Sequence, residues 1–547
     1  MAHRHIDREQ RRLHLPTVSV FALIFSAIFL LHGALLRLPY FWDEAGYFVP
    51  AAWDILHGGG LIPHTTLSNA HPPVVMLWLA AWWKLSAFSP VVTRTAMLLV
   101  AAFGLLGLYK LARLVSNSAV AAGTVALTAL YPVFFAQSSL AQLDVPAMAL
   151  ILWATYFYLS GRRSLCIAVA ALACVTKETA VVVPLTFFAW ELVCYVAHRR
   201  IAGSNAGGGS AERWLLDPVA PWKSFCHLLA LLPLVGWYAY HYLHTGHVFG
   251  NPEYLQYNMG ATLTPLRIVI AAGMRLWHTF GYMNLFVLTV ISLLAMGLPP
   301  VEDDAIERPR ISLRVQAVFG VLILAHVAEF SLLGGALLAR YMLPVIPLVI
   351  LLCVATLWRR LAHWQWWTAA VGAAFVVALL ASPPWRIAPE DNLTYSDFVQ
   401  LHKQAAIYVE QHYANEKILT AWPASDELHR PFLGYVKHPL TVVRVENFTL
   451  DQMIEAARER DGYDIVVAFS TKYNPPSGWV NRLRWWNRIQ EKYFDYHSDL
   501  GPRMIAAMLR GHIVWQRAKG GEWIAVIELD KIRNASLQGP GHGLLAP

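Results

Sequence analysis

The feature that most constrains this chain is a succession of long apolar segments separated by short polar ones. A helix needs about 20 mostly apolar residues to cross the hydrocarbon core of a bilayer. About eleven segments approach this length, and all end before residue 385, so we expect an α-helical polytopic membrane protein. The expected spans are 17–36, 91–109, 119–138, 146–160, 164–176, 179–196, 224–243, 283–299, 315–333, 335–357 and 366–384. The short pair 164–176 and 179–196 could instead form one bent hairpin, broken at the polar residues 176–179.

The composition supports a membrane protein and argues against nucleic acid as a partner. Only 14% of the 547 residues are charged, whereas a soluble protein carries about 25%. The net charge is +8, but the lysines and arginines gather at the ends of apolar segments. The five cysteines lie in or beside expected spans without metal-binding spacing, and we interpret them as buried apolar side chains.

The basic residues predict the orientation, because cytoplasmic loops carry an excess of Lys and Arg. When the spans are followed alternately, every dense basic cluster falls on the side of the N-terminus. We therefore expect a multi-pass protein of the cell membrane, with a cytoplasmic N-terminus and an extracytoplasmic C-terminal domain. The clusters are Arg4, Arg8, Arg11 and Arg12; Lys110 and Arg113; Arg162 and Arg163; Arg199, Arg200 and Arg213; Arg308, Arg310 and Arg314; and Arg359 and Arg360.

The composition changes near residue 385, which predicts a transmembrane domain over 1–385 and a soluble α/β domain over 386–547. Charged residues return, and strand-like and helix-like stretches alternate. Gly520-Gly521 between two apolar runs is a hairpin signal. No Gly-rich phosphate-binding motif is found, so we expect no nucleotide cofactor. The expected strands are 417–421, 440–445, 463–469, 513–517 and 523–529, and the expected helices are 397–412, 450–460 and 479–492.

Ionisable residues gather at the span ends that face outside on this topology. Such groups are costly at membrane depth and usually face a cavity or a partner. Transfer from a lipid phosphate needs a base, which a carboxylate can supply, and cations that hold the phosphate. Carboxylate oxygens also suit a divalent cation. The candidates are Asp43, Glu44, His71, Asp144, Lys177, Glu178, Glu329, Arg340 and Tyr341.

The acidic candidates also have a structural interpretation. Asp43 and Glu44 could cap the helix expected over 45–56, because acids favour helix N-termini. Asp144 could cap the helix that begins near Pro146.

The same holds for the other candidates. Lys177 could pair with Glu178 or extend its ammonium group to the membrane surface. Arg340 could be an anchor at the membrane interface, and His71 an ordinary loop residue.

At these residues the chain resembles the membrane glycosyltransferases that use polyprenyl-phosphate sugars. This superfamily, called GT-C, includes protein O-mannosyltransferases and lipid A aminoarabinose transferases. The resemblance covers about residues 15–385, although the acid usually found two residues before the histidine is Asn69 here. The motifs that carry it are Trp42-Asp43-Glu44, His71-Pro72-Pro73, Leu143-Asp144-Val145-Pro146, Thr176-Lys177-Glu178 and Arg340-Tyr341-Met342-Leu343-Pro344.

The resemblance implies a GT-C fold and a role for each motif. A divalent cation, Mg²⁺ or Mn²⁺, is a candidate cofactor. The C-terminal domain resembles the soluble tail of the aminoarabinose-type enzymes in placement and size. The implied roles are catalytic acids for Asp43, the base, and Glu44; donor phosphate binding for Lys177, Arg340 and Tyr341; acceptor or loop contact for His71; and metal binding for Asp144 with Glu44.

The expected function is transfer of a hexosyl- or pentosyl-type sugar from a polyprenyl-phosphate carrier to an extracytoplasmic hydroxyl. The expected partners are membrane lipid and the lipid-linked donor, while the acceptor, a lipid, glycan or protein, stays open. A transporter of a lipid-linked or small polar solute is the main alternative. Transporters often contain two related halves, and no such repeat is found. An assembly factor without enzymatic activity is a third interpretation.

The topology can be tested by labelling single cysteines placed at Ser204 and Ser470. Because the basic clusters put these positions on opposite sides, an impermeant thiol reagent should reach one from the cytoplasmic face and the other from outside. Labelling of both from the same side would contradict the predicted orientation and the outward-facing site.

Overall fold

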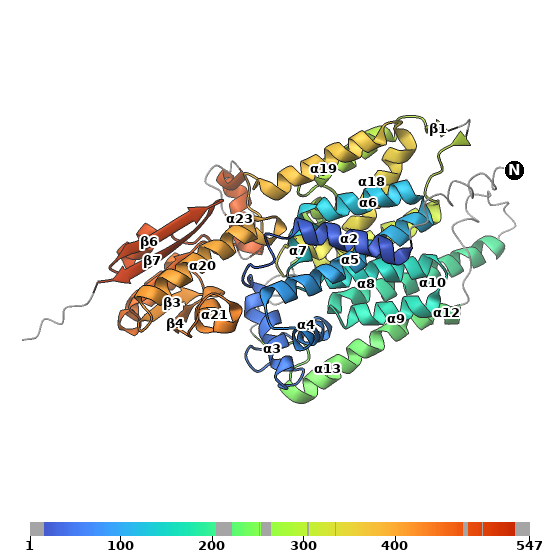
Figure 1. The fold of residues 1–547 in the computed structure, drawn as a ribbon. Helices are drawn as coiled ribbons and strands as arrows, with labels where there is room; N and C mark the ends of the chain where they lie inside the picture. Colours follow the sequence, from blue (N-terminus) through green and yellow to red (C-terminus); the bar gives the residue numbers. More distant parts are fainter. Residues whose placement is uncertain are drawn as a thin grey trace, which may run out of the picture. The chain divides into compact units, whose positions relative to one another are not determined.

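The computed structural model describes residues 16–203, 221–250, 252, 264–303, 306–333, 335–473, 480–494 and 496–530. The N-terminal basic cluster and Arg213 lie outside these residues. The chain divides into two units (Figure 1). The helical unit comprises Met1–Gln400, Lys472–His497 and Lys519–Glu522, and the α/β unit comprises Leu401–Thr471, Ser498–Ala518 and Trp523–Pro547. The division differs from the predicted boundary after residue 385, because residues 386–400 and two later segments group with the helices.

Each expected span overlaps a helix or a pair of helices of the helical unit. Proline stands at the first or second position of several of them, where its missing N–H has no helical partner to lose. The helices are α2 (Thr17–Leu31), α3 (Val49–Leu56), α4 (Val74–Leu85), α5 (Pro90–Val115), α6 (Ser118–Leu130), α7 (Pro132–Ser138), α8 (Asp144–Leu159), α9 (Arg163–Cys174), α10 (Val182–Gly203), α12 (Pro221–Phe225), α13 (Leu232–Thr245), α15 (Pro265–Phe280), α16 (Leu285–Ala295), α17 (Leu313–Leu332), α18 (Ile346–Arg360), α19 (Trp364–Leu380) and α23 (Arg484–Tyr493).

Shorter elements join these helices. A π-helical turn, η1, contains Glu44 and precedes α3, and two of the 3-10 turns contain Glu178, Arg340 and Tyr341. They are η1 (Glu44–Phe48), η2 (Glu178–Val181), η3 (Cys226–Leu231), η5 (Ala339–Met342), η6 (Pro389–Asp391) and η9 (Val480–Arg482), with a small hairpin of β1 (Glu302–Asp303) and β2 (Ile306–Glu307).

Among the described residues, three helices are long and apolar enough to cross a membrane, or up to five if each of two bent pairs counts as one span. The bent pairs are α6 with α7, at 71°, and α15 with α16, at 78°. Several other apolar helices are shorter than a full span, so the count of about eleven stays a prediction. Helix α15 was not expected, because its charged residues Arg267 and Arg275 interrupt the apolar pattern although both are buried.

Close helix contacts organise the helical unit. Helix α5 packs against α2, α6 and α8, which Figure 1 shows side by side. A Cβ atom on Gly104 of α5 would lie 2.9 Å from the Cβ of Ala149 in α8, and one on Gly107 would lie 2.9 Å from the ring of Trp153. Small residues at these points let the two backbones approach, as is usual between membrane helices.

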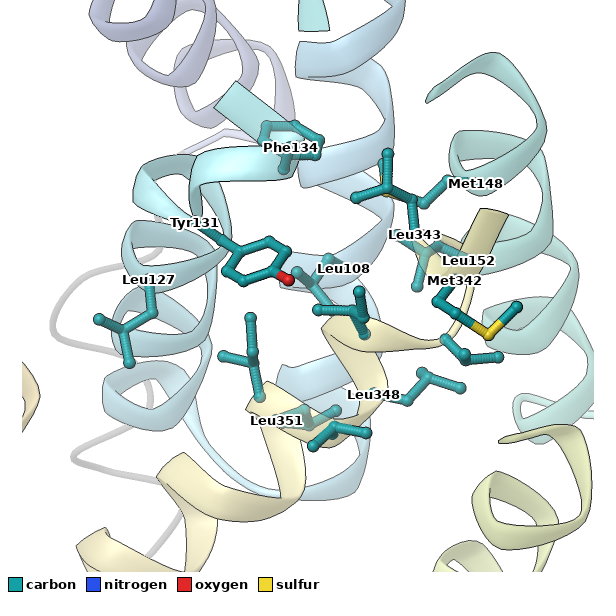
Figure 2. Packing of buried hydrophobic residues seen from close by; sticks show 14 of the residues in the cluster. Leu108, Leu127, Tyr131, Phe134, Met148, Leu152, Met342, Leu343, Leu348 and Leu351 are labelled. Atoms are coloured by element: carbon teal, nitrogen blue, oxygen red, sulfur yellow. The ribbon is translucent and has the colours of Figure 1, made fainter. Parts of the chain in front are cut away.

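The hydrophobic core of this unit fixes the segment that carries Arg340. Met342 and Leu343, just beyond Arg340, are fully buried and pack with residues of α5, α8 and α18. Figure 2 shows them among Leu152, Tyr131 and Leu348. An apolar anchor therefore holds the backbone immediately after the arginine.

The α/β unit contains the predicted strands. The sheet order is β4-β3-β5-β7-β6. β3 pairs in parallel with β4 and β5, and β5 pairs antiparallel with β7. The predicted hairpin at Gly520-Gly521 joins β6 and β7, and both glycines have positive φ. The elements are α20 (Thr394–His412), which continues from the helical unit, β3 (Lys417–Ala421), α21 (Ala424–His429), η7 (Pro431–Leu433), β4 (Thr441–Val445), α22 (Leu450–Arg458), η8 (Arg460–Gly462), β5 (Ile465–Phe469), α24 (Pro502–Met508), β6 (Gly511–Lys519) and β7 (Glu522–Leu529).

Candidate active site

Asp43 stands at an unusual backbone turn after the first helix. Trp42 has a φ of 46°, a conformation that a bulky residue rarely adopts. The π-helical turn η1 follows at once. Rare conformations of both kinds are found preferentially at functional sites. The side chain of Asp43 does not cap the following helix, so the capping interpretation does not hold for it.

Arg340 is the centre of a buried polar cluster. Its side chain is 8% exposed, and its Nη2 lies 2.6 Å from Oδ2 of Asp43. Its Nε lies 3.5 Å from Oδ2 of Asp144, and its Nη1 lies 3.4 Å from Oε1 of Glu390. Nη1 also donates to the side-chain oxygen of Gln142. One guanidinium therefore contacts carboxylates from three distant segments, each through a different nitrogen of its planar group.

Lys177 extends this cluster. Its Nζ lies 2.5 Å from Oδ1 of Asp144. Lys177 therefore forms its ion pair with Asp144 and not with Glu178. Nζ also lies 4.4 Å from the centre of the Tyr341 ring. Tyr341 stacks on Phe330, with ring centres 5.0 Å apart. Asp144 is the first residue of α8, and its two carboxylate oxygens lie against Lys177 and Arg340.

His71 and Glu178 form a neighbouring pair. Nδ1 of His71 lies 3.1 Å from Oε2 of Glu178. The imidazole packs against the rings of Tyr47 and Phe48, with ring centres 5.7 and 5.8 Å away. The pair joins the loop before α4 to the turn that carries Lys177. His71 thus lies near the Arg340 cluster, because its partner Glu178 directly follows Lys177 in the chain. Its predicted contact with the acceptor stays a prediction.

Glu44 is placed differently from its predicted roles. It is fully buried, and its carboxylate pairs with the guanidinium of Arg94. The same carboxylate accepts hydrogen bonds from the backbone N–H of Phe41, at 2.8 Å, and of Ala141, at 2.5 Å. A carboxylate with all of these donors has no free lone pair for a substrate or a metal. The structure therefore corrects the assignment of Glu44 as a catalytic or metal-binding acid and gives it a structural role.

Three residues of this region were not found from the sequence. Arg94 looks like an ordinary charge near the start of an apolar helix. Glu390 and Asp391 follow the last expected span, in η6, where they look like the first acids of a soluble domain. A usable signal was present for the last two, because two adjacent acids stand a few residues after the last expected span.

Helix α15 holds the chain that leads to Arg340. Arg275 is fully buried and donates to the backbone oxygens of Leu338, at 2.6 Å, and Ala336, at 2.9 Å. Arg267 donates to the oxygen of Gly335, at 2.8 Å. Two arginines therefore satisfy carbonyl groups that the irregular segment before η5 leaves without helical partners.

Burial alters the proton affinity of the acids in η6. It raises the pKa of Asp391 to about 7, and the neighbouring Glu390 adds to the rise. The Oδ2 of Asp391 accepts a hydrogen bond of 2.6 Å from the hydroxyl of Tyr282. Burial also raises the pKa of Glu390, although the attraction of Arg340 opposes this. The cluster therefore contains carboxyl groups that exchange protons closer to neutrality than exposed acids do.

The described residues do not fit the predicted divalent cation. No group of three or more His, Cys, Asp or Glu side chains placed for a metal is found in the described part of the chain. Glu44 is saturated by donors, and the oxygens of Asp144 face Lys177 and Arg340. A cation at Asp144 would have to displace both positive side chains, so no step of the mechanism below uses a metal.

The comparisons with known proteins show a family resemblance and a shared fold. Residues 70–206 match the model of the dolichyl-phosphate-mannose-protein mannosyltransferase family, a stretch that includes His71, Asp144 and Lys177. The solved structure of ArnT from Cupriavidus metallidurans, bound to undecaprenyl phosphate, shares the fold with 14% identity, a TM-score of 0.50, and coverage of 96% of this chain and 99% of that chain. The chain resembles the polyprenyl-phosphate membrane glycosyltransferases. The predicted resemblance is thereby confirmed.

A second structure was also found among these matches. An oligosaccharyltransferase from Archaeoglobus fulgidus, in complex with Zn and sulfate, matches with 12% identity and a TM-score of 0.43, over 83% of this chain and 68% of that chain. No curated protein matches the chain by sequence.

Asp391→Asn should make the stability of the protein less dependent on pH. Because the folded protein holds the proton of Asp391 more tightly than the unfolded chain does, this group contributes stability that is fully present below its ordinary pKa of 3.8 and is lost as the pH rises through about 7. The loss is on the order of a few kcal/mol. The melting temperature of the wild type should therefore fall more steeply than that of the variant between about pH 4 and pH 7. Glu416→Gln, at an exposed acid, is the control, and parallel curves for Asp391→Asn and wild type would contradict the expected role.

Proposed function

We propose that this protein transfers a sugar from a polyprenyl-phosphate carrier to an acceptor hydroxyl. The observation that carries the proposal is the buried cluster around Arg340, which gathers Asp43, Asp144 and Lys177 from distant parts of an apolar helical unit. The family match over residues 70–206 and the fold shared with ArnT support it. We further propose that the sugar is a hexose or pentose and that the protein lies in the cell membrane with this site on the outer side.

Asp43 is the proposed base. Its side chain is 28% exposed, whereas those of Asp144 and Glu390 are 5% and 7% exposed. It is therefore the carboxylate around Arg340 that an acceptor can best reach. Asp43 takes the proton of the acceptor hydroxyl while that oxygen attacks the anomeric carbon of the sugar. Its ion pair with Arg340 orients the carboxylate for this step.

Arg340 and Lys177 are the proposed phosphate-binding groups. As the bond between the anomeric carbon and the phosphate oxygen breaks, the electron pair stays on the phosphate, and cations placed there stabilise the growing charge. The ring of Tyr341 lies 4.4 Å from Nζ of Lys177 and 5.7 Å from the guanidinium of Arg340. Tyr341 therefore positions both cations through its face. Asp144 lies against the same two cations and supplies a counter-charge for them in the absence of the donor.

Asp43→Asn should reduce sugar transfer by about 10²–10⁴-fold, because the amide cannot accept the proton. The variant should keep its fold, since Asp43 is partly exposed. Glu44→Gln should instead lower the melting temperature, because it leaves Arg94 buried without its counter-charge. Transfer is measured as release of polyprenyl phosphate from a labelled donor in proteoliposomes, together with uptake of polar solutes. A stable, inactive Glu44→Gln beside an active Asp43→Asn would contradict the assignment, and solute uptake without phosphate release would favour a transporter.

Arg340→Lys should also impair transfer, because it keeps the charge but loses the planar group that contacts three carboxylates at once. Lys177→Met should both weaken donor binding and slow departure of the phosphate. KM for the donor and kcat should therefore change together for Lys177→Met. The matched control is Lys84→Met, the same change at an exposed position of α4. Wild-type kinetics for both site variants would exclude a role in holding the phosphate.

A further inference from the structure

The mechanism leaves unexplained a short helix, α23, that has a strongly basic outer face. Its sequence is RWWNRIQEKY, and it spans 10 residues. Arg484, Arg488 and Lys492 are spaced four residues apart and are all exposed, as is Glu491. Trp485, next to this row, is 61% exposed. Residues three or four apart lie on the same side of a helix, so three cations share one surface with the neighbouring indole ring and with Glu491, which leaves a net positive charge there.

The opposite side of α23 is fixed to the end of α19. Asn487 and Gln490 accept hydrogen bonds from Nη1 of Arg386, at 3.0 and 2.8 Å. Arg386 follows the end of α19 at Leu380 by a few residues. Its guanidinium also lies 3.9 Å from the centre of the Tyr496 ring. Helix α23 is thus held beside the end of an apolar helix, all within the helical unit.

The C-terminal end of α23 is fixed to a second apolar element. The backbone oxygen of Tyr493 accepts a hydrogen bond of 3.2 Å from Nε of Arg267. The guanidinium of Arg267 lies 5.4 Å from the ring centre of Phe494. Arg267 stands in the first turn of α15 and also binds Gly335, on the segment that leads to Arg340. Helix α23 therefore lies at the helix ends that carry the candidate site.

The exposed face of α23 has the chemistry of a membrane-surface helix. In the described part of the chain, no ion pair engages Arg484, Arg488 or Lys492, so their charge is available to an external anion. Tryptophan prefers the level of the lipid headgroups, and a helix with basic and aromatic residues on one surface typically lies in the interfacial plane. A twofold contact with a second copy would instead bring like charges together.

We propose that α23 lies on the membrane surface at the side of the candidate site and binds anionic phospholipid headgroups through Arg484, Arg488 and Lys492, with Trp485 at headgroup depth. The proposal rests on the membrane placement proposed above. Through Arg267 and Gly335, this contact fixes the depth of the Arg340 segment relative to the lipid surface. A polyprenyl-phosphate donor presents its phosphate at that same depth.

The test uses the full-length protein with a spin label at Trp485→Cys, reconstituted in phosphatidylcholine vesicles with or without about 30% phosphatidylglycerol. Collision with oxygen is compared with collision with a water-soluble nickel chelate. Identically treated wild type gives the background from its own cysteines. The label should be more accessible to oxygen than a label at Glu455→Cys, an exposed position of α22. Phosphatidylglycerol should move the Trp485 label deeper.

The combined Arg484→Gln, Arg488→Gln and Lys492→Gln variant should lose this response to phosphatidylglycerol while keeping its melting temperature. High salt should have the same effect, since it screens exposed charges. The matched control neutralises three exposed arginines of the α/β unit, at positions 458, 503 and 517, and should retain the response.

Two results would overturn the proposal. A Trp485 label that matches the Glu455 label in both kinds of vesicle would show that α23 lies in water. Spin–spin broadening between Trp485 labels would show that a second copy covers this face. Neither readout depends on sugar transfer, so a failure of the proposed enzymatic function would be seen separately in the release of polyprenyl phosphate.

Discussion

The polar architecture of the helical unit depends on one buried guanidinium. Removing a cation from water without compensation is strongly unfavourable, so Arg340 requires carboxylates around it. These come from the turn after α2, from the start of α8 and from η6. The requirement for neutralisation therefore fixes three segments that are far apart in the chain. Asp144 also pairs with Lys177, so the turn between α9 and α10 is held at the same cluster.

The adjacent acids Asp43 and Glu44 have different partners because of helical geometry. Consecutive side chains of a helical turn point in different directions. At the start of η1, the carboxylate of Asp43 contacts Arg340 and is partly exposed to solvent. The carboxylate of Glu44 is buried and contacts Arg94. Glu44 also accepts from the N–H of Ala141, in the segment just before α8. The buried acid therefore holds together the backbone segments that present Asp43 and Asp144, so it supports the site without reaching a substrate.

The segment before Arg340 has no regular hydrogen-bonding partners of its own, and α15 supplies them. Arg267 and Arg275 donate to its carbonyl groups, and the apolar core packs against the residues that follow. The chain before Arg340 and the chain after it are thus both held by interactions that do not involve the carboxylates. A preorganised cation of this kind can stabilise developing charge without first rearranging. Arg267 also donates to α23, so one arginine connects the Arg340 segment with the basic surface of α23.

The sequence by itself determined the apolar helices, the strands of the α/β unit and most of the polar residues of the site. Apolar length, period-two alternation and charges at span ends are local properties, so Asp43, Asp144, Lys177 and Arg340 could be recognised without coordinates. The tertiary structure alone decided their partners. Glu44 and Asp43 look equivalent in sequence, but only packing shows that Arg94 saturates one of them. Glu390 and α15 were missed, because the roles of their charged residues arise from contacts across distant segments: a charge is buried only where the fold supplies its counter-charge or carbonyl partners.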